Sequence, residues 1–226
     1  AGLQLVSHPR HVTLDVAQPT GRRLFLDLVR EADLVLDNHH PDEMRAWGLE
    51  YPHLQEVNPR VILTSITPFG WEGPWAHYKG NDLIVFHTSG TGYETPSAYV
   101  TDPENEPPLK GAGYQADMTT GWTAASATMI ALRHQQRYGE GQLVDVSAQE
   151  ALTNMIRPNI AFWTYTGDPR AGRFKRGPKR ALACKDGYVC VVAAQDNHWA
   201  NMLRMMGNPE WAETELFATR DARWEN

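Results

Sequence analysis

The sequence contains no apolar run close to the roughly eighteen consecutive residues that a membrane-spanning helix needs. It also opens, in AGLQLVSHPR, without the basic segment and long apolar core of a secretory signal peptide. The net charge of -6 gives no excess of positive charge for nucleic acid, and no recognised nucleic-acid motif is present. We therefore expect a cytoplasmic globular protein with no membrane partner and no nucleic-acid partner.

Several motifs of cofactor chemistry are missing as well. No G-x-G-x-x-G follows a predicted strand, and no G-x-x-x-x-G-K followed by Ser or Thr occurs, which argues against a nicotinamide enzyme and against a P-loop nucleotidase. No G-x-S-x-G provides a nucleophilic serine. His39 and His40 are adjacent, but no third ligand stands at a suitable local spacing, so we expect no metal.

Cysteine is scarce, because only Cys184 and Cys190 occur, in ALACKDGYVCVV. The pair could form a disulfide or half of a metal site. Two reduced thiols on one strand pair, in a reducing compartment, agree better with the cytoplasmic expectation. We assign no chemistry to them.

Short apolar runs alternate along much of the chain with segments of helical periodicity. The apolar runs predict strands over 11–16, 32–37, 61–66 and 142–147. Helical spacing predicts helices over 24–29, 41–47, 51–57, 82–89, 118–138 and 148–163, the last one interrupted or kinked at Pro158. This alternation indicates an α/β fold with a parallel sheet. The glycine-rich loop 67–80 follows a strand, at the end where such sheets bind ligands.

The composition changes near Thr166, where we place a domain boundary. A strand over 188–194 and an amphipathic helix over 197–206 follow this change. We therefore expect a large domain over residues 1–165 and the start of a smaller α+β domain over residues 166–226.

Residues 91–113 are predicted to form an extended connection, and residues 164–180 a linker. The second contains RAGRFKRGPKR, from Arg170 to Arg180, with six basic residues and no acidic residue. A run of this kind is usually a solvated loop, and its alternative role is to meet the phosphates of an anionic ligand.

Asp117 stands where a loop turns into the longest predicted helix. We expect its side chain to cap that helix, as Asp82 is expected to cap the helix over 82–89. Most of the long helix should be buried, through the apolar stripe Met118, Trp122, Ala125, Met129 and Leu132 and the small-residue face Ala124, Ala127 and Ala131. Taken alone, a capping aspartate favours a structural role.

Several segments, taken in chain order, resemble the family III CoA-transferases. ADLVLDNHHPDEMRAWGLEYPHLQEVNPRVILTSITPFGWEGP resembles the family's stretch up to its glycine loop, and GNDLIVFHTSG the segment that follows. ADMTTGWTAASATMIALRHQQRYGEGQLVDVSAQE resembles the nucleophile segment, and KDGYVCVVAAQDNHW the start of the small domain. The resemblance implies a Rossmann-like parallel sheet for the large domain.

The resemblance also implies the chemistry. Asp117 aligns with the family's catalytic aspartate, whose carboxylate attacks an acyl-CoA thioester to give a mixed anhydride and then an aspartyl-CoA thioester that a carboxylate acceptor resolves. N–H groups of the loop from Gly70 to Gly73 are candidates for stabilising the oxyanion. The implied partners are acyl-CoA and a carboxylate acceptor, and the full-length form is expected to be an interlocked homodimer.

Coenzyme A, as the acyl-CoA substrate, is the implied ligand. Leu14 and Asn38 match residues that contact CoA in the family, whereas His39 replaces a phenylalanine. Ala17 replaces a usual lysine, and Ala46 replaces a usual arginine. Candidates to compensate for these two missing cations are Arg45, Lys79 and the basic run from Arg170 to Arg180.

Two alternatives accompany the transferase prediction. One is an α-methylacyl-CoA racemase, but Asn81 and Gln195 stand where racemases of this family carry their proton-exchanging histidine and glutamate, which favours transfer. The other is a non-catalytic CoA-binding or scaffold half, suggested by Ala17 and Ala46. Family members are commonly much longer, so we expect a fragment that lacks a first strand-helix unit and a C-terminal return to the large domain.

Overall fold

The computed structural model describes residues 11–95, 102, 105–167, 181–191, 193 and 195–225. The chain divides into two compact units, Ala1–Ser89 with Ala112–Met155, and Gly90–Gly111 with Ile156–Asn226. The basic run from Arg170 to Arg180 lies outside the described residues. The predicted domain boundary near Thr166 stays a prediction.

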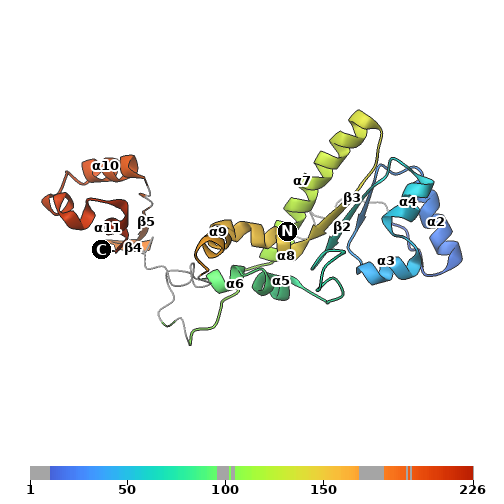
Figure 1. The fold of residues 1–226 in the computed structure, drawn as a ribbon, viewed down its shortest axis with the longest axis horizontal. Helices are drawn as coiled ribbons and strands as arrows, with labels where there is room; N and C mark the ends of the chain where they lie inside the picture. Colours follow the sequence, from blue (N-terminus) through green and yellow to red (C-terminus); the bar gives the residue numbers. More distant parts are fainter. Residues whose placement is uncertain are drawn as a thin grey trace. The chain divides into compact units, whose positions relative to one another are not determined.

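A parallel sheet forms the centre of the first unit (Figure 1). Its strands are β1 (Leu34–Asp37), β2 (Ile62–Thr67) and β3 (Leu143–Ser147), in the order β1-β2-β3, with both pairs parallel. Strand β2 has neighbours on both sides and is buried along nearly its whole length. The predicted α/β fold with a parallel sheet is confirmed.

Three helices cover one face of this sheet, namely α2 (Pro19–Val29), α3 (Pro41–Trp47) and α4 (Tyr51–Val57). Proline occupies the first turn of each, where its missing N–H leaves no helical hydrogen bond unmade. Helix α3 ends at Gly48, whose φ of 61° lies in the left-handed region that glycine adopts readily. The core on this face contains Val29, Met44, Leu49, Leu54, Val61, Leu63 and Trp71.

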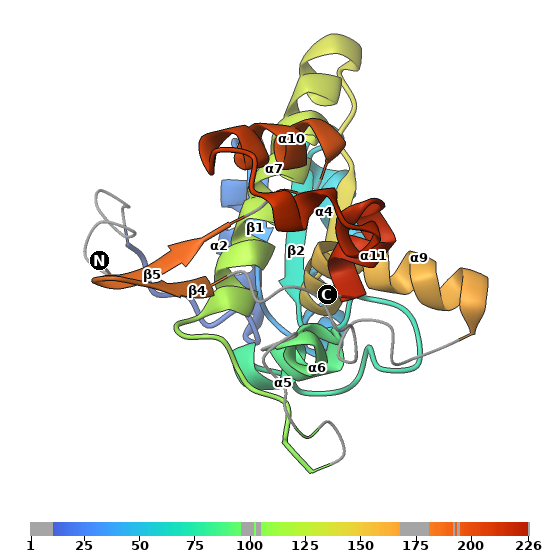
Figure 2. The same ribbon diagram turned by 90° about the vertical axis from the view of Figure 1, so that its left-hand side faces the viewer.

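The long helix α7 (Gln115–Tyr138) packs on the opposite face, along β2 and β3 (Figure 1 and Figure 2). Alternation along β2 sends Leu63 to the first core and Thr64 to this side, where its hydroxyl lies 2.7 Å from the hydroxyl of Thr128. Farther along the helix, Gln135 donates to the carbonyl oxygen of Arg60 over 2.6 Å. Helices α5 (Asp82–Thr88) and α8 (Ala148–Thr153) pack near the start of α7.

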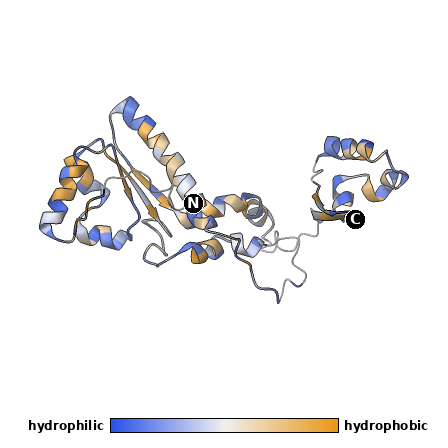
Figure 3. Ribbon diagram, turned by 180° about the vertical axis from the view of Figure 1, so that it is seen from behind, coloured by the Kyte–Doolittle hydropathy of each residue, from blue (hydrophilic) through white to orange (hydrophobic). Residues whose placement is uncertain are grey.

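The expectation that most of α7 is buried was wrong for the described chain. Its buried positions are small or polar, namely Ala116, Thr120, Ala124, Thr128, Ala131 and Gln135. The predicted apolar stripe is largely exposed, with Trp122 at 74% and Met129 at 63% of their full accessibility. Small side chains let the helix axis approach the sheet closely, so the alanine face lies inward, while the larger apolar residues Trp122 and Met129 remain exposed. Figure 3 shows that the strands of the sheet are mainly hydrophobic.

The predicted strand over 11–16 was also wrong, since residues 11–15 have no regular structure. A strand needs a neighbour to satisfy its backbone groups, and no described strand pairs with this segment. The predicted helix over 148–163 is interrupted at residues 154–156, a short 3-10 segment. Pro158 therefore lies in the first turn of the next helix, α9 (Arg157–Thr166), where proline is well tolerated.

The second unit begins with α6 (Thr91–Glu94), a short helix inside the stretch that was expected to be extended. Beyond α9 it contains the antiparallel hairpin of β4 (Ala181–Cys184) and β5 (Gly187–Cys190), then α10 (Asp196–Met205), η3 (Glu210–Glu213), η4 (Glu215–Phe217) and α11 (Arg220–Glu225). The rings of Trp199, Trp211 and Phe217 pack together, with centroids 5.0 to 6.4 Å apart. Both cysteines are free and exposed.

Gly141 provides a test of the packing beneath β3. A Cβ atom added there would lie 2.0 Å from the carbonyl oxygen of Val61, a backbone atom that cannot rotate away. We expect Gly141→Ala to lower the free energy of unfolding by about 1–3 kcal/mol, measured by urea denaturation. Gly121→Ala is the matched control, because its Cβ would meet nothing within 4 Å and alanine favours the helix by about 0.5–1 kcal/mol. Equal unfolding midpoints for the two variants would contradict the packing described here.

Candidate functional site

Asp117 lies in the first turn of α7, but it does not cap the helix. The helix begins at Gln115 with Tyr114 as its capping residue, so Asp117 is the third helical residue, and the predicted cap was wrong. The capping acceptor comes from elsewhere in the chain. The Oδ1 atom of Asp82 accepts the backbone N–H of Ala116 over 2.8 Å and that of Asp117 over 3.2 Å.

Asp82 can reach α7 because its own helix is capped by its neighbour. The side chain of Asn81 accepts the N–H of Ile84 over 3.1 Å, so Asn81, and not Asp82 as predicted, caps α5. Asp82 is buried, with 7% of its surface exposed. Its carboxylate therefore ties the start of α5 to the start of α7 and fixes the backbone that carries Asp117.

The loop before α5 is closed tightly at its base. A Cβ atom on Gly80 would lie 2.5 Å from the Cβ atom of Pro68, so only glycine fits this approach without a shift. The two ends of loop 67–80 are held together in this way just before Asn81 and Asp82. The position of the loop and that of Asp117 are thereby coupled through Asp82.

The surroundings of Asp117 suit an ionised carboxylate. The residue is exposed, and it stands in the first turn of a helix of 24 residues. The partial positive charge at a helix N-terminus stabilises a nearby carboxylate. An accessible carboxylate in this place has the properties that a nucleophile requires.

Two amides of the glycine loop are already engaged within the chain. The N–H of Gly70 donates to the hydroxyl of Thr67 over 2.8 Å, and the N–H of Trp71 donates to the carboxylate of Asp145 over 2.9 Å. The remaining candidates for stabilising the oxyanion are therefore the other N–H groups of the loop from Gly70 to Gly73.

A cavity of about 460 Å³ opens beside α2 and α3. Its lining residues are Val16, Ala17, Pro19, Arg22, Arg23, Leu26, Arg30, Ala46 and Trp47. The structure thus brings together Ala17 and Ala46, the two positions at which the resemblance leads us to expect cations. It also adds three arginines that the sequence analysis did not select. The spacing of Arg23 and Arg30 was the signal, since residues seven apart share one helix face.

Some of the predicted CoA-binding residues lie near this cavity. His39 follows β1, and its Nδ1 lies 2.6 Å from the carboxylate of Asp37. Its ring meets that of Trp47 edge-on at 5.0 Å between centroids, and Trp47 lines the cavity. Leu14 is half-buried and Asn38 is exposed. Their roles in CoA binding stay predictions.

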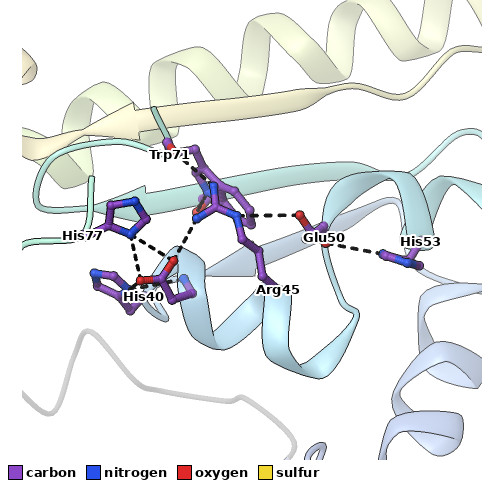
Figure 4. Close-up of polar contacts among 8 residues, drawn as sticks. His40, Arg45, Glu50, His53, Trp71 and His77 are labelled. Atoms are coloured by element: carbon purple, nitrogen blue, oxygen red, sulfur yellow. Dashed lines mark hydrogen bonds and ion pairs between the residues drawn. The ribbon is translucent and has the colours of Figure 1, made fainter. Parts of the chain in front are cut away.

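Arg45 belongs to a separate polar network (Figure 4). Its guanidinium lies 3.0 Å from the carboxylate of Asp42, donates to the carbonyl oxygen of Trp71 over 3.2 Å and lies 5.2 Å from the Trp71 ring centroid. His77 contacts the same carboxylate of Asp42 at 2.9 Å. Arg45 does not line the cavity beside α2, and neither does the exposed Lys79.

The family model for CoA-transferase family III matches residues 8–226, and the chain belongs to this family. It is 31% identical over 228 residues to the succinyl-CoA–L-malate CoA-transferase alpha subunit of Chloroflexus aurantiacus, covering 99% of this chain and 52% of that protein. It is 31% identical to the succinate–glutarate CoA-transferase of Agrobacterium fabrum, covering 95% of this chain and 53% of that protein. The chain spans about half the length of the curated relatives it matches.

Solved structures show the same fold. The CAIB/BAIF family protein from Brucella suis has a TM-score of 0.70 at 29% identity, and the hypothetical protein Rv3272 from Mycobacterium tuberculosis has a TM-score of 0.78 at 25% identity. Each match covers 95% of this chain and 56% of the other.

The described residues contain neither a membrane-spanning helix nor a cluster of metal ligands. None of the helices in those parts of the chain is long and apolar enough to cross a membrane. Among the same residues, no group of three or more His, Cys, Asp and Glu side chains is arranged to hold a metal ion.

The cap formed by Asp82 can be tested by substitution. Asp82→Ala leaves the N–H groups of Ala116 and Asp117 without this acceptor, and we expect it to lower the free energy of unfolding by about 1–3 kcal/mol. Asp82→Asn retains an Oδ1 acceptor and should lower the free energy of unfolding by less than Asp82→Ala does. Hydrogen exchange of the two amides should accelerate in the alanine variant. Unchanged exchange and unchanged unfolding in that variant would rule out the cap.

The polar network around Arg45 makes a prediction for the pKa of Asp42. The hydrogen bond from His77 lowers the pKa of the Asp42 carboxyl below its ordinary value of 3.8, with smaller help from Arg45. The stabilisation that goes with this shift is fully present above pH 3.8 and is lost as the pH falls through the lowered pKa. We expect His77→Ala to raise the pKa of Asp42 toward 3.8, measured by NMR titration of the carboxyl carbon. A pKa that stays low in this variant would show that His77 is not the main cause.

Proposed function

We propose that this protein transfers CoA from an acyl-CoA thioester to a carboxylate acceptor, with Asp117 as the nucleophile. The observation that carries the proposal is the placement of Asp117 in a family III chain: it is exposed in the first turn of α7, and Asp82 holds its backbone N–H. A helix N-terminus favours a negatively charged carboxylate, and the anchored backbone limits the positions that the Asp117 side chain can take.

In the first half of the proposed reaction, a carboxylate oxygen of Asp117 attacks the carbonyl carbon of the acyl-CoA thioester. The carbon–sulfur bond breaks, CoA leaves as the thiolate, and the acyl group remains on Asp117 as a mixed anhydride. The thiolate then attacks the Asp117 carbonyl carbon of this anhydride. The donor leaves as its carboxylate, and Asp117 carries CoA as a thioester.

The second half repeats these steps in reverse with the acceptor. The acceptor carboxylate attacks the Asp117 thioester carbonyl, which releases the CoA thiolate and forms a second mixed anhydride. Attack by the thiolate on the acceptor carbonyl gives the new acyl-CoA and returns Asp117 as a carboxylate. No net proton or electron is exchanged, so the residues of the site need only position the reactants and stabilise the oxyanions.

The names of the relatives suggest the class of acceptor. Those proteins are named for transfer between succinyl-CoA and malate and between succinate and glutarate. All of these acceptors are small carboxylates, and we propose an acceptor of this class for the present protein. The cytoplasmic location and the interlocked homodimer of the full-length form remain parts of the same proposal.

The racemase alternative receives little support from the site. The side chain of Asn81 is used as the cap of α5, and an amide cannot exchange the α-proton of a substrate as histidine does. Gln195 precedes α10 and also lacks a titratable group. Transfer of CoA requires neither residue to exchange a proton.

Asp117→Asn tests the proposal directly. The amide is a poor nucleophile, so we expect transfer between succinyl-CoA and a panel of small carboxylates to fall by at least about 10³-fold. In the parent protein, hydroxylamine should convert the Asp117 thioester to a hydroxamate that mass spectrometry assigns to this residue. Glu56→Gln, which neutralises an exposed carboxylate on α4, serves as the control and should keep its activity.

Three results would contradict the proposal in different ways. Parental transfer activity in Asp117→Asn would show that Asp117 is not the nucleophile. Entry of solvent deuterium at the α-carbon of a 2-methylacyl-CoA, without transfer, would identify a racemase. Recovery of intact acyl-CoA from its complex with the protein, with no adduct and no turnover, would identify a non-catalytic CoA-binding half.

A further inference from the structure

Helix α3 contacts the glycine loop at two points, and both contacts come from one pair of side chains (Figure 4). Arg45 donates to the carbonyl oxygen of Trp71 over 3.2 Å, and a carboxylate oxygen of Asp42 lies 2.9 Å from Nδ1 of His77. Asp42 and Arg45 stand three residues apart on one helix face, with 3.0 Å between the carboxylate and the guanidinium. The pair therefore contacts both ends of the loop segment 72–76.

The first end of this segment is fixed through the polar groups of Trp71. Its backbone N–H donates to the Asp145 carboxylate over 2.9 Å, and its indole N–H donates to the hydroxyl of Ser65 over 2.7 Å. Its carbonyl oxygen accepts from Arg45, whose guanidinium lies 5.2 Å from the centroid of the buried ring. Strands β2 and β3 and helix α3 thus hold one residue together, and this end of the segment has a single position.

The second end is held by the Asp42 carboxylate. Nδ1 of His77 lies 2.9 Å from one carboxylate oxygen and 3.1 Å from the other. No other described residue forms a hydrogen bond or an ion pair with this imidazole. The side chains of His77 and Asp42 are 65% and 48% exposed, and pairs between exposed groups contribute little to stability. The contact therefore places the loop without being needed for folding.

The segment between these two ends carries groups that the proposed reaction can use. The N–H groups of Glu72 and Gly73 are the remaining candidates for stabilising an oxyanion, since those of Gly70 and Trp71 are engaged within the chain. Both Glu72 and Gly73 are exposed. A donor to an oxyanion must lie about 2.7–3.1 Å from the oxygen that develops the charge. A segment held at one end only would not keep its N–H groups at that distance.

We propose that Asp42 is a positioning residue for CoA transfer: through His77 it holds the segment 72–76 where its N–H groups stabilise the oxyanion. The inference rests on the proposed function for the reaction itself. Arg45 contributes by contacting Asp42 and Trp71 together, which sets the two ends of the segment relative to each other. An oxyanion forms in the transition state and not in the bound substrate, so loss of the Asp42–His77 contact lowers turnover and leaves substrate binding intact.

Steady-state kinetics of transfer from succinyl-CoA to a small carboxylate separates positioning from binding. We expect His77→Ala to lower kcat by about 10–100-fold and to leave the KM for succinyl-CoA within about twofold of the parental value. His77→Asn keeps an N–H donor close to the place of Nδ1 and should recover most of the loss, whereas His77→Phe keeps a ring without a donor and should not. His134→Ala removes an exposed histidine of α7 outside this network and should keep the parental kcat.

Hydrogen exchange gives a readout that does not depend on turnover. The N–H of Ala76 donates to the carbonyl oxygen of Gly73 over 3.3 Å, and that of Tyr78 donates to the carbonyl oxygen of Trp75 over 2.8 Å. We expect both amides to exchange about tenfold faster in His77→Ala and at the parental rate in His77→Asn, because release of one end lets the segment open locally. Circular dichroism checks that each variant is folded.

The inference and the proposed function can fail separately. A parental kcat in His77→Ala, or a rise in KM that accounts for the whole loss of kcat/KM, would overturn the positioning role. Equal losses in His77→Asn and His77→Phe would overturn it as well, because the donor would then not matter. If Asp117→Asn keeps parental transfer, the proposed function fails, while faster exchange in His77→Ala still shows that Asp42 positions the segment. If transfer requires Asp117 and His77→Ala keeps the parental kcat, the proposed function stands and the role of Asp42 is wrong.

Discussion

The contact between Asp82 and the start of α7 is the constraint on which the proposed site depends. A helix leaves its first N–H groups without partners, and burial makes that loss costly. Here a buried carboxylate from α5 accepts two of them, and one belongs to Asp117. The same contact therefore satisfies the helix, joins two distant segments and sets the position of the proposed nucleophile. Glycine at position 80 allows the preceding loop to close and to bring Asp82 to this place.

Much of the fold could be predicted because its signals are local. Apolar runs, helical periodicity, prolines in first turns and the glycine after α3 located the sheet strands and most helices within a few residues. The caps could not be placed in this way. Sequence shows that Asp82 and Asp117 both stand near helix starts, but a contact across 35 positions decides which carboxylate serves which helix. The strand expected over 11–16 failed for a related reason, because pairing is also a long-range property.

The burial of α7 shows a second limit of prediction from sequence, which concerns the face of a helix that is buried. Periodicity predicted two candidate faces, one of large apolar side chains and one of alanines, and hydrophobicity alone favoured burying both. In the described chain, Ala124 and Ala131 meet the sheet, while Trp122 and Met129 remain exposed. Close approach of helix and sheet demands small side chains at the contact, a requirement of shape that a hydrophobic pattern does not record. The cavity beside α2 was missed similarly, because the packing of α2 against α3 creates it.

Attack by the proposed nucleophile and binding of the substrate's phosphates require different degrees of positional precision. A nucleophile must meet one carbonyl carbon within a narrow range of positions, so Asp117 depends on an anchored helix start. A phosphate can be neutralised from any wall of its pocket, since charge acts over several ångströms and arginine reaches far from its backbone. Binding energy gained far from the reacting carbon still helps to hold it against Asp117, so the two requirements remain coupled through the substrate.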